Sequence, residues 1–271
     1  MLVFPNAKIN LGLNVTGTRP DGFHNIETAL FPISLCDVLE INLSKDLPFE
    51  FKVSGMIISG RDQDNLCVRA YNLLKERYNL PNVRMHLHKV IPMGAGLGGG
   101  SSDAAFTIRL LNDLFALALS DLQMKQYASQ LGSDCSFFID DVPCFAFGKG
   151  DQLESLKLNL KGYSIIIIVP LVHVSTVDAY KVVEVKKPDQ DIRTILQTSP
   201  LTWKNTLSND FENHIFQLHP EIRRIKEELY KTGAVYASMS GSGSAVYGLF
   251  DRKIPELNSF TGCKTWLQRI S

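Results

Sequence analysis

A glycine-rich stretch at residues 91–105 constrains the fold of this chain more than any other feature. Five glycines fall within the seven positions 94–100. An alternating run at 83–90, typical of a strand, precedes the glycines, and a run at 104–115, typical of a helix, follows them. Glycine allows a positive φ and a close approach to a bulky anion, and a helix start adds unpaired N–H groups. The order strand, loop, helix therefore predicts a phosphate-binding site.

Three other interpretations of the loop compete with a phosphate site. A flexible Gly/Ser linker would not be framed by an apolar strand and a helix start. A Walker A loop needs a Lys-Ser or Lys-Thr pair after the last glycine, and no such pair follows Gly100. A dinucleotide fingerprint fits Gly94, Gly96 and Gly99, with Asp121 about twenty residues further on. However, Asp121 lies in the capping-box pattern S-D-L-Q at 120–123, which predicts a helix start where a Rossmann unit would end a strand.

The composition excludes several classes of protein. The 271 residues include 28 Lys plus Arg and 28 Asp plus Glu, so no net positive field would attract nucleic acid or an anionic membrane. Five scattered cysteines without C-x-x-C spacing favour reduced thiols over disulfides or zinc. His86 and His88 could form a metal pair, but an exposed strand face explains them without a third ligand. With no leader segment and no membrane-length apolar run in the sequence, we expect a cytoplasmic globular protein.

Periodicity and capping residues predict the remaining elements. Strands are expected at 7–15, 38–43, 49–53, 83–90, 143–150, 163–169, 234–239 and 245–250. Helices are expected from Asp64 or Asn65 to about Arg77, then at 104–115, 121–131 and 210–231, with a short helix after Ser175 that carries Tyr180. The segment 185–200, rich in Lys, Asp and Pro, is expected to be a solvated excursion, and 240–244 a tight hairpin turn.

Five polar or aromatic residues are candidates for function in this framework. Lys8 and Asn10 share the face of the first strand opposite its apolar side, which makes that face either a surface or a site. Phe23 and His24 follow a tight turn that returns the chain toward this strand. Asp134 stands between a glycine and an apolar stretch, where a carboxylate serves either as a helix N-cap or in function.

Several of these motifs resemble those of the GHMP kinases, which include galactokinase and the homoserine, mevalonate and phosphomevalonate kinases. The loop at 92–105 is similar to the family's phosphate loop. One branch of the family phosphorylates a cytidine diphosphate-linked methylerythritol, and further motifs resemble that branch: N-A-K-I-N at 6–10, D-G-F-H at 21–24, D-N-L at 64–66, the Asp134 segment and the loop 238–244. They occur in the family's order, from residue 6 to about residue 250.

The resemblance implies an α+β class and the two-domain GHMP kinase fold. In this fold the N-terminal half is ribosomal protein S5 domain 2-like and the C-terminal half is ferredoxin-like, with a cleft between them. We expect residues 1–151 to form the ATP-binding domain with the catalytic Lys and Asp. Residues 152–271 would form the C-terminal domain that completes the substrate cleft.

The resemblance also implies the reaction. The γ-phosphoryl group of ATP would pass to the 2-hydroxyl of the cytidine diphosphate-linked methylerythritol, a step of non-mevalonate (MEP) isoprenoid biosynthesis. The family's catalytic pair corresponds to Lys8 and Asp134. Asp134 would accept the hydroxyl proton as general base, and Lys8 would favour the anionic forms of the carboxyl and of the reacting oxygen.

The residues that would bind ATP also follow from the resemblance. Asn65 corresponds to the family residue beside the adenine. The loop that would wrap the phosphates comprises Pro92, Met93, Gly94, Ala95, Gly96, Leu97, Gly98, Gly99, Gly100, Ser101 and Ser102. Ser101 or Ser102 would lie near Mg²⁺, whose ligands the sequence leaves open. Ala95 replaces a common Gly and Asp103 a frequent Asn, which are small departures from the family pattern.

The other substrate would bind through residues from both halves of the chain. Phe23 and Tyr180 correspond to an aromatic pair that sandwiches the cytosine, and Phe23 replaces the family's usual Tyr, which keeps the stacking but loses a phenol hydrogen bond. The predicted acceptor-binding residues are Asn10, Phe23, His24, Thr176, Tyr180 and Gly241.

The implied partners are therefore ATP, Mg²⁺ and one small-molecule acceptor. We expect neither nucleic acid nor membrane binding, and a monomer or weak homodimer. Two alternatives stay open: another GHMP small-molecule kinase, of the homoserine or mevalonate type, or a non-catalytic nucleotide-binding module.

Overall fold

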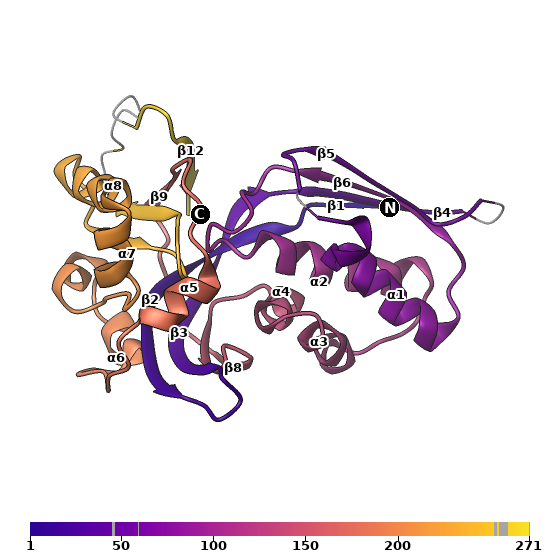
Figure 1. Ribbon diagram of the computed structural model, residues 1–271, viewed down its shortest axis with the longest axis horizontal. Helices are drawn as coiled ribbons and strands as arrows, with labels where there is room; N and C mark the ends of the chain where they lie inside the picture. The colour runs from indigo at the N-terminus through magenta and orange to yellow at the C-terminus, as the bar shows by residue number, and fades with distance from the viewer. Residues whose placement is uncertain (45–46, 59, 252–253, 255–259, 271) are drawn as a thin grey trace. The chain divides into compact units, whose positions relative to one another are not determined.

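The computed structural model describes residues 1–44, 47–58, 60–251, 254 and 260–270, and its chain forms two compact units (Figure 1). The first unit comprises Met1–Ala7, Ser34–Met93 and Gly98–Val142. The second comprises Lys8–Ile33, Gly94–Leu97 and Pro143–Ser271. Both units combine helices and strands, in agreement with the predicted α+β class.

The first unit is a four-stranded sheet with helices. Its sheet has the order β1-β4-β6-β5, and Figure 1 shows α1 and α2 along one face. The strands are β1 (Leu2–Val3), β4 (Val38–Leu43), β5 (Glu50–Gly55) and β6 (Val83–Lys89). The helices are α1 (Leu66–Tyr78), α2 (Gly99–Leu114), α3 (Asp121–Ser129) and α4 (Phe137–Asp140), with 3₁₀ turns at Asp62–Asp64 and Ser133–Ser136.

The alternation predicted for residues 83–90 sets the faces of this sheet. In β6, which pairs antiparallel with β4 and parallel with β5, Val83, Met85 and Leu87 are buried, whereas the residues between them are exposed. The last residue of the strand, Lys89, lies on the buried face, where it is 2% exposed. The buried face of the strand that leads into the glycine loop therefore ends with a positively charged side chain.

The second unit contains two four-stranded sheets, with orders β2-β3-β7-β8 and β10-β11-β9-β12. The strands are β2 (Asn6–Thr18), β3 (His24–Cys36), β7 (Cys144–Gly148), β8 (Gln152–Ser155), β9 (Ser164–Val169), β10 (Tyr236–Met239), β11 (Val246–Phe250) and β12 (Lys264–Arg269). The helices are α5 (Thr176–Val182), α6 (Ile192–Leu196), α7 (Glu212–Leu218) and α8 (Pro220–Lys231), with a 3₁₀ helix at Pro200–Asn205. All six residues of β9 are buried, as expected for an apolar run in a central strand.

Three expected elements differ from the observed ones. Helix α2 begins at Gly99, not at residue 104, because its first turn needs few internal hydrogen bonds and tolerates the Gly-Gly-Ser-Ser start. The single helix expected at 210–231 is two helices, since Pro220 lacks an N–H and forces His219 out of the helical region, to φ −130° and ψ 74°. The segment expected to be solvated carries α6, whose Ile192 and Ile195 are buried.

The two units are not divided by a single boundary in the sequence. Lys8–Ile33 and Gly94–Leu97 belong to the second unit, together with the chain from Pro143 onward. The division into family domains after residue 151 stays a prediction. Strand β3 pairs with β7 across more than one hundred residues of chain, from Ile26 opposite Gly148 to Leu30 opposite Cys144, and this pairing holds the early hairpin in the second unit. Within the described ranges, no helix is both long and apolar enough to cross a membrane.

Candidate active site

The glycine loop has the backbone conformation that the sequence predicted. Gly94, Gly96 and Gly98 all have positive φ, of 64°, 79° and 72°. Gly96 is the most constrained, because a Cβ atom there would lie 1.9 Å from the carbonyl oxygen of Ser240. Only glycine allows the backbones at these two positions to approach so closely. The small-residue loop 240–244 forms the hairpin turn between β10 and β11 that the sequence predicted. It also packs against the glycine loop.

In the second unit, Lys8 lies in a hydrogen-bonded network that joins β2 to both of these loops. The Lys8 ammonium donates to Asn10 Oδ1 at 2.6 Å and to the Gly96 carbonyl at 3.1 Å. Asn10 Nδ2 donates to Thr28 Oγ1 at 3.0 Å, so both ends of the Asn10 amide are engaged. Lys8 and Asn10 are 3% and 4% exposed. The polar face of β2 is therefore a buried site and not a surface.

Ser240 and Tyr247 complete this network, and neither was predicted from the sequence. Ser240 Oγ donates to the Gly96 carbonyl at 2.8 Å and accepts the Asn10 backbone N–H at 3.2 Å. Tyr247 Oη donates to the Asn10 carbonyl at 2.7 Å. Burial raises the pKa of the Tyr247 phenol well above its usual value, so it serves as a neutral donor. Only the small-residue pattern at 238–244 pointed to this region in the sequence.

The predicted acceptor residues lie around the start of β3, α5 and the second loop. The His24 and Tyr180 rings are 5.2 Å apart between centroids at an angle of 33°, and Tyr180 also packs edge-on against Phe211. Phe23 is 58% exposed, with the Lys149 ammonium 5.3 Å from its ring centroid. An exposed ring beside a turn is available to stack on a ligand.

Thr176 and Gly241 contact other members of the second unit. Thr176 Oγ1 lies 3.0 Å from Ser242 Oγ, which links the start of α5 to the second loop. The Gly241 carbonyl accepts from Asn209 Nδ2 at 2.8 Å. A Cβ atom at Gly241 would lie 3.3 Å from the Gly96 Cα. Gly241 therefore lies against the glycine loop, and Thr176 contacts the loop that carries Gly241.

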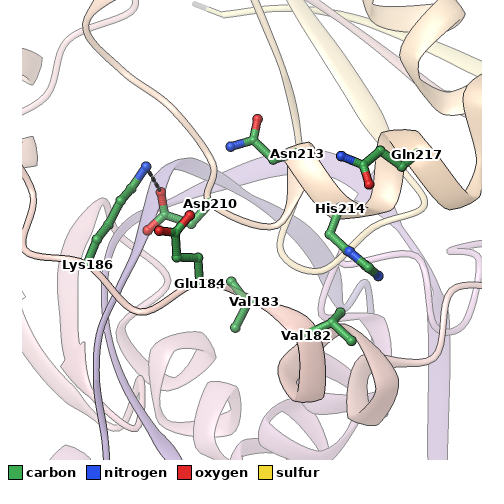
Figure 2. A pocket seen from close by; sticks show the side chains of 8 residues that line it. All are labelled: Val182, Val183, Glu184, Lys186, Asp210, Asn213, His214 and Gln217. Carbon is green, nitrogen blue, oxygen red and sulfur yellow. Dashed lines mark ion pairs between the residues drawn. The ribbon is translucent and has the colours of Figure 1, made fainter.

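A pocket of about 160 Å³ opens where α5 ends (Figure 2). It is lined by Val182, Val183, Glu184, Lys186, Asp210, Asn213, His214 and Gln217. Lys186 Nζ lies 3.4 Å from Asp210 Oδ1, and Asp210 Oδ2 accepts the Val15 N–H at 2.8 Å. None of the residues that line this pocket was predicted to belong to a site. The predicted site residue nearest in the sequence is Tyr180, two positions before Val182.

In the first unit, Asp134 occupies the second position of the 3₁₀ helix Ser133–Ser136. Gly132 is the N-cap of that helix and Ser136 the N-cap of α4, so the alternative use of Asp134 as an N-cap is not realised. The segment lies beside the start of α2: the Ser101 hydroxyl contacts the Cys135 thiol, whose pKa is raised to about 11, mainly by burial. The structure thus brings the Asp134 segment next to one residue of the predicted phosphate loop.

Asn65, the residue expected beside the adenine, is the N-cap of α1. Its side-chain oxygen accepts the Cys67 N–H at 2.9 Å, as the capping pattern predicted. Asn65 therefore fixes the start of the helix that packs on α2. Its contact with a nucleotide stays a prediction.

Side chains suited to a metal ion are few. Among the residues that the structure describes, no three His, Cys, Asp or Glu side chains are grouped to hold one. Ser54 Oγ lies 2.8 Å and 2.9 Å from ring nitrogens of His86 and His88, whose strand face is exposed. Ser102 Oγ, by contrast, is fully buried with no hydrogen-bond partner in the described structure. Such an oxygen fits Mg²⁺, which takes most of its ligands from phosphates and water.

Comparison with protein families defines the class to which this fold and loop belong. The family description "GHMP kinases N terminal domain" matches residues 65–149, and "GHMP kinases C terminal" matches residues 184–256. A crystal structure of Methanococcus jannaschii mevalonate kinase covers 100% of this chain and 98% of its own, with a TM-score of 0.75. At 14% identity, that likeness shows the fold alone. The class is that of the ATP-dependent GHMP kinases, phosphotransferases that act on an alcohol.

Closer relatives narrow the assignment. A Bacteroides fragilis (strain YCH46) protein named 4-diphosphocytidyl-2-C-methyl-D-erythritol kinase is 49% identical over 262 residues, 95% of this chain and 96% of that protein. A crystal structure of 4-(cytidine 5'-diphospho)-2C-methyl-D-erythritol kinase has a TM-score of 0.84 at 30% identity and covers 98% of both chains. The chain therefore belongs to the GHMP kinases, and within them to the family of the 4-diphosphocytidyl-2-C-methyl-D-erythritol kinases.

Proposed function

We propose that this chain transfers the γ-phosphoryl group of ATP to the 2-hydroxyl of 4-diphosphocytidyl-2-C-methyl-D-erythritol, a step of non-mevalonate isoprenoid biosynthesis. The observation that carries the proposal is 49% identity along 95% of the chain to a kinase of that name. The cytoplasmic location and the monomer or weak homodimer expected from the sequence are part of the same proposal.

In the proposed mechanism, Asp134 removes the proton from the 2-hydroxyl while the oxygen attacks the γ-phosphorus and the bond to the β-phosphate oxygen breaks. Lys8 stabilises the negative charge on the reacting oxygen, and its bonds to Asn10 and Gly96 support that role because they fix the ammonium. Phosphoryl transfer depends mainly on such positioning and charge stabilisation. Loop residues 92–102 would bind the phosphates, and Asn65 would lie beside the adenine.

Mg²⁺ would neutralise charge on the phosphates when it is bound with ATP. We assign the Ser101 or Ser102 hydroxyl as the protein group nearest to it, on the support of the buried, unpartnered Ser102 Oγ. Phe23 and Tyr180 would hold the cytosine between them. Asn10, His24, Thr176 and Gly241 would contact the rest of the acceptor.

The test is coupled ADP production with 4-diphosphocytidyl-2-C-methyl-D-erythritol, alongside homoserine and mevalonate. We expect ADP release with the cytidine compound only, with mass spectrometry and ³¹P NMR placing the new phosphate on the 2-hydroxyl. Turnover of homoserine or mevalonate instead would identify another GHMP kinase. ATP binding without ADP release in the presence of any of the three alcohols would identify a nucleotide-binding module.

A further inference from the structure

Three ionisable side chains meet inside the first unit, directly beneath the start of α2. Lys89 Nζ donates to Asp103 Oδ2 at 2.8 Å and forms a closer ion pair with Asp37 Oδ2. Lys89, Asp37 and Asp103 are 2%, 0% and 2% exposed. The proposed reaction uses none of them, and none is near enough to the surface to be a solvated ion pair.

The cluster holds the chain at the entrance to the phosphate loop. Asp37 Oδ1 accepts the backbone N–H groups of Val90 and Ile91, at 2.5 Å and 2.8 Å. These two residues lead from the end of β6 toward the loop. One carboxylate thus fixes the direction in which the backbone leaves the sheet.

The cluster also holds the start of α2. Asp103 belongs to the first turns of that helix, and the Lys89 ammonium lies against Gly99, its first residue. A Cβ atom at Gly99 would be 2.9 Å from Lys89 Nζ and 2.8 Å from the Ile91 side chain. The Lys89 ammonium therefore fixes the distance between the first turn of α2 and the sheet. The position of the N-terminal N–H groups of α2 depends on that distance.

Stability alone is a poor explanation for such a cluster. Buried ion pairs lose about as much free energy through desolvation as they gain by attraction, and apolar side chains of similar size often stabilise a protein as well. This cluster carries two carboxyl groups for one ammonium, and Asp103 Oδ1 is buried with no hydrogen-bond partner in the described structure.

We propose that Lys89, Asp37 and Asp103 form a positioning cluster for the phosphate loop. The cluster orients the backbone N–H groups at the start of α2 toward the phosphates of ATP, and its three side chains act through Val90, Ile91 and Gly99 without touching the nucleotide. This inference rests on the proposed ATP-dependent function. Loop residues 92–102 would contact the phosphates, and the three residues of the cluster would hold the backbone of that loop in position.

The test compares nucleotides that carry phosphates with one that does not. In the full-length Lys89→Met variant, the backbone N–H groups at the start of α2 should no longer be held toward the phosphates. The Kd of ATP and the inhibition constant of ADP should therefore rise about tenfold or more, which is the usual effect of losing one hydrogen bond between an N–H group and a charged phosphate. The inhibition constant of adenosine and the KM of the acceptor should stay within about twofold, because neither depends on the phosphate loop. The conservative Asp103→Asn variant, which keeps an acceptor for Lys89, should keep ATP affinity within about threefold of the wild type.

Lys226→Met is the matched control, because it also removes a lysine from an ion pair with a buried carboxylate, Glu212, in the second unit. It should lower the melting temperature without separating ATP from adenosine. Equal losses for ATP and adenosine in Lys89→Met, or wild-type constants for both, would overturn the inference. If Lys89→Met does not fold, Asp37→Asn provides the same comparison with the same overturning outcomes. Failure of the proposed function would show in the wild type instead, as a lack of turnover with the cytidine acceptor.

Discussion

At the residue scale, the two predicted catalytic groups have different local surroundings. Lys8 is buried, and its ammonium donates to uncharged oxygens of Asn10 and Gly96. Asp134 is half-buried in a short 3₁₀ helix, where it does not cap a helix. The hydrogen bonds to two neutral oxygens fix the position of the Lys8 ammonium, and helix capping does not account for Asp134.

Replacement of Asp134 tests its role as general base. We expect Asp134→Asn to lower kcat by about 10²–10⁴-fold, because an amide of the same size cannot accept the hydroxyl proton. The Kd of ATP, measured by calorimetry, should change little. Asp140→Asn, which removes an exposed carboxylate paired with Lys125, is the control and should keep the wild-type rate. Near-normal turnover in purified Asp134→Asn would refute the assignment of the base.

Replacement of Phe23 tests the predicted cytosine sandwich. Because Phe23 is 58% exposed, Phe23→Ala should leave the melting temperature nearly unchanged. It should raise the KM of the cytidine acceptor by roughly 5–150-fold, which corresponds to the 1–3 kcal/mol of a base stacked on one aromatic ring. Phe23→Tyr keeps the ring and is the matched control in steady-state kinetics. An unchanged KM in Phe23→Ala would remove Phe23 from the acceptor site.

Some residues of the candidate site could be predicted from the sequence and others could not. Lys8 and Asn10 became candidates because alternation separates them from the apolar face of their strand. Lys89 was missed, although the same alternation places it on the core face of β6, because a lysine after an apolar row is usually exposed. Ser240 was missed as an individual residue, since its bonds to Asn10 and Gly96 span distances in the chain that no local pattern reports.

At the scale of the element, the contact between the two glycine-containing loops should tolerate an added side chain poorly. Gly96→Ala should abolish measurable phosphotransfer and lower the melting temperature, because its Cβ would overlap the Ser240 carbonyl, a backbone atom that cannot rotate away. Gly162→Ala is the matched control: Gly162 also has a positive φ, of 90°, but nothing lies within 4 Å of the position that an added methyl group would take. Gly162→Ala should therefore cost only about 1–2 kcal/mol of backbone strain. Equal melting temperatures in the two variants would show that the loops separate at little cost.

The prediction of elements succeeded where local chemistry decides the outcome. The capping box at Ser120 and Gln123 and the cap at Ser175 start α3 and α5 as expected. Two of the three differences noted above came from tertiary packing and from one overlooked helix breaker. Residues 185–200 look solvated by composition, yet α6 buries three side chains in the second unit, and Pro220 ends a helical pattern that hydrophobic spacing alone would continue.

At the scale of the whole molecule, long-range pairing decides which residues fold together. Strands β2 and β3 come early in the chain but share a sheet with β7 and β8. A division of the sequence at a single position cannot describe this arrangement, because strands that are far apart in the chain pair in one sheet. The predicted motifs nevertheless fall in both units, with Lys8 in the second and Asp134 in the first.

The buried cluster should also leave a mark on the stability of the whole chain. Asp103 faces Lys89, Asp37 and the thiol of Cys67, and burial is the main reason that its pKa is raised from 3.8 to about 7. Between these two values the folded state keeps a proton that the unfolded state has released. The free energy of unfolding should therefore fall as the pH rises from about 4 to about 7, and it should change no further through Asp103 above that range.

Asp103→Asn removes this contribution, so its free energy of unfolding relative to the wild type should increase as the pH rises from 5 to 8. Denaturant unfolding followed by circular dichroism, without nucleotide or divalent cations, measures the difference. Asp178→Asn is the control of opposite sign, because the pKa of the exposed Asp178 is lowered by its hydrogen bond with Lys181. Its difference from the wild type should be constant over that range, since Asp178 is ionised in both states. Parallel profiles for Asp103→Asn and the wild type would mean that Asp103 ionises normally and that the cluster carries a full second negative charge beneath the phosphate loop.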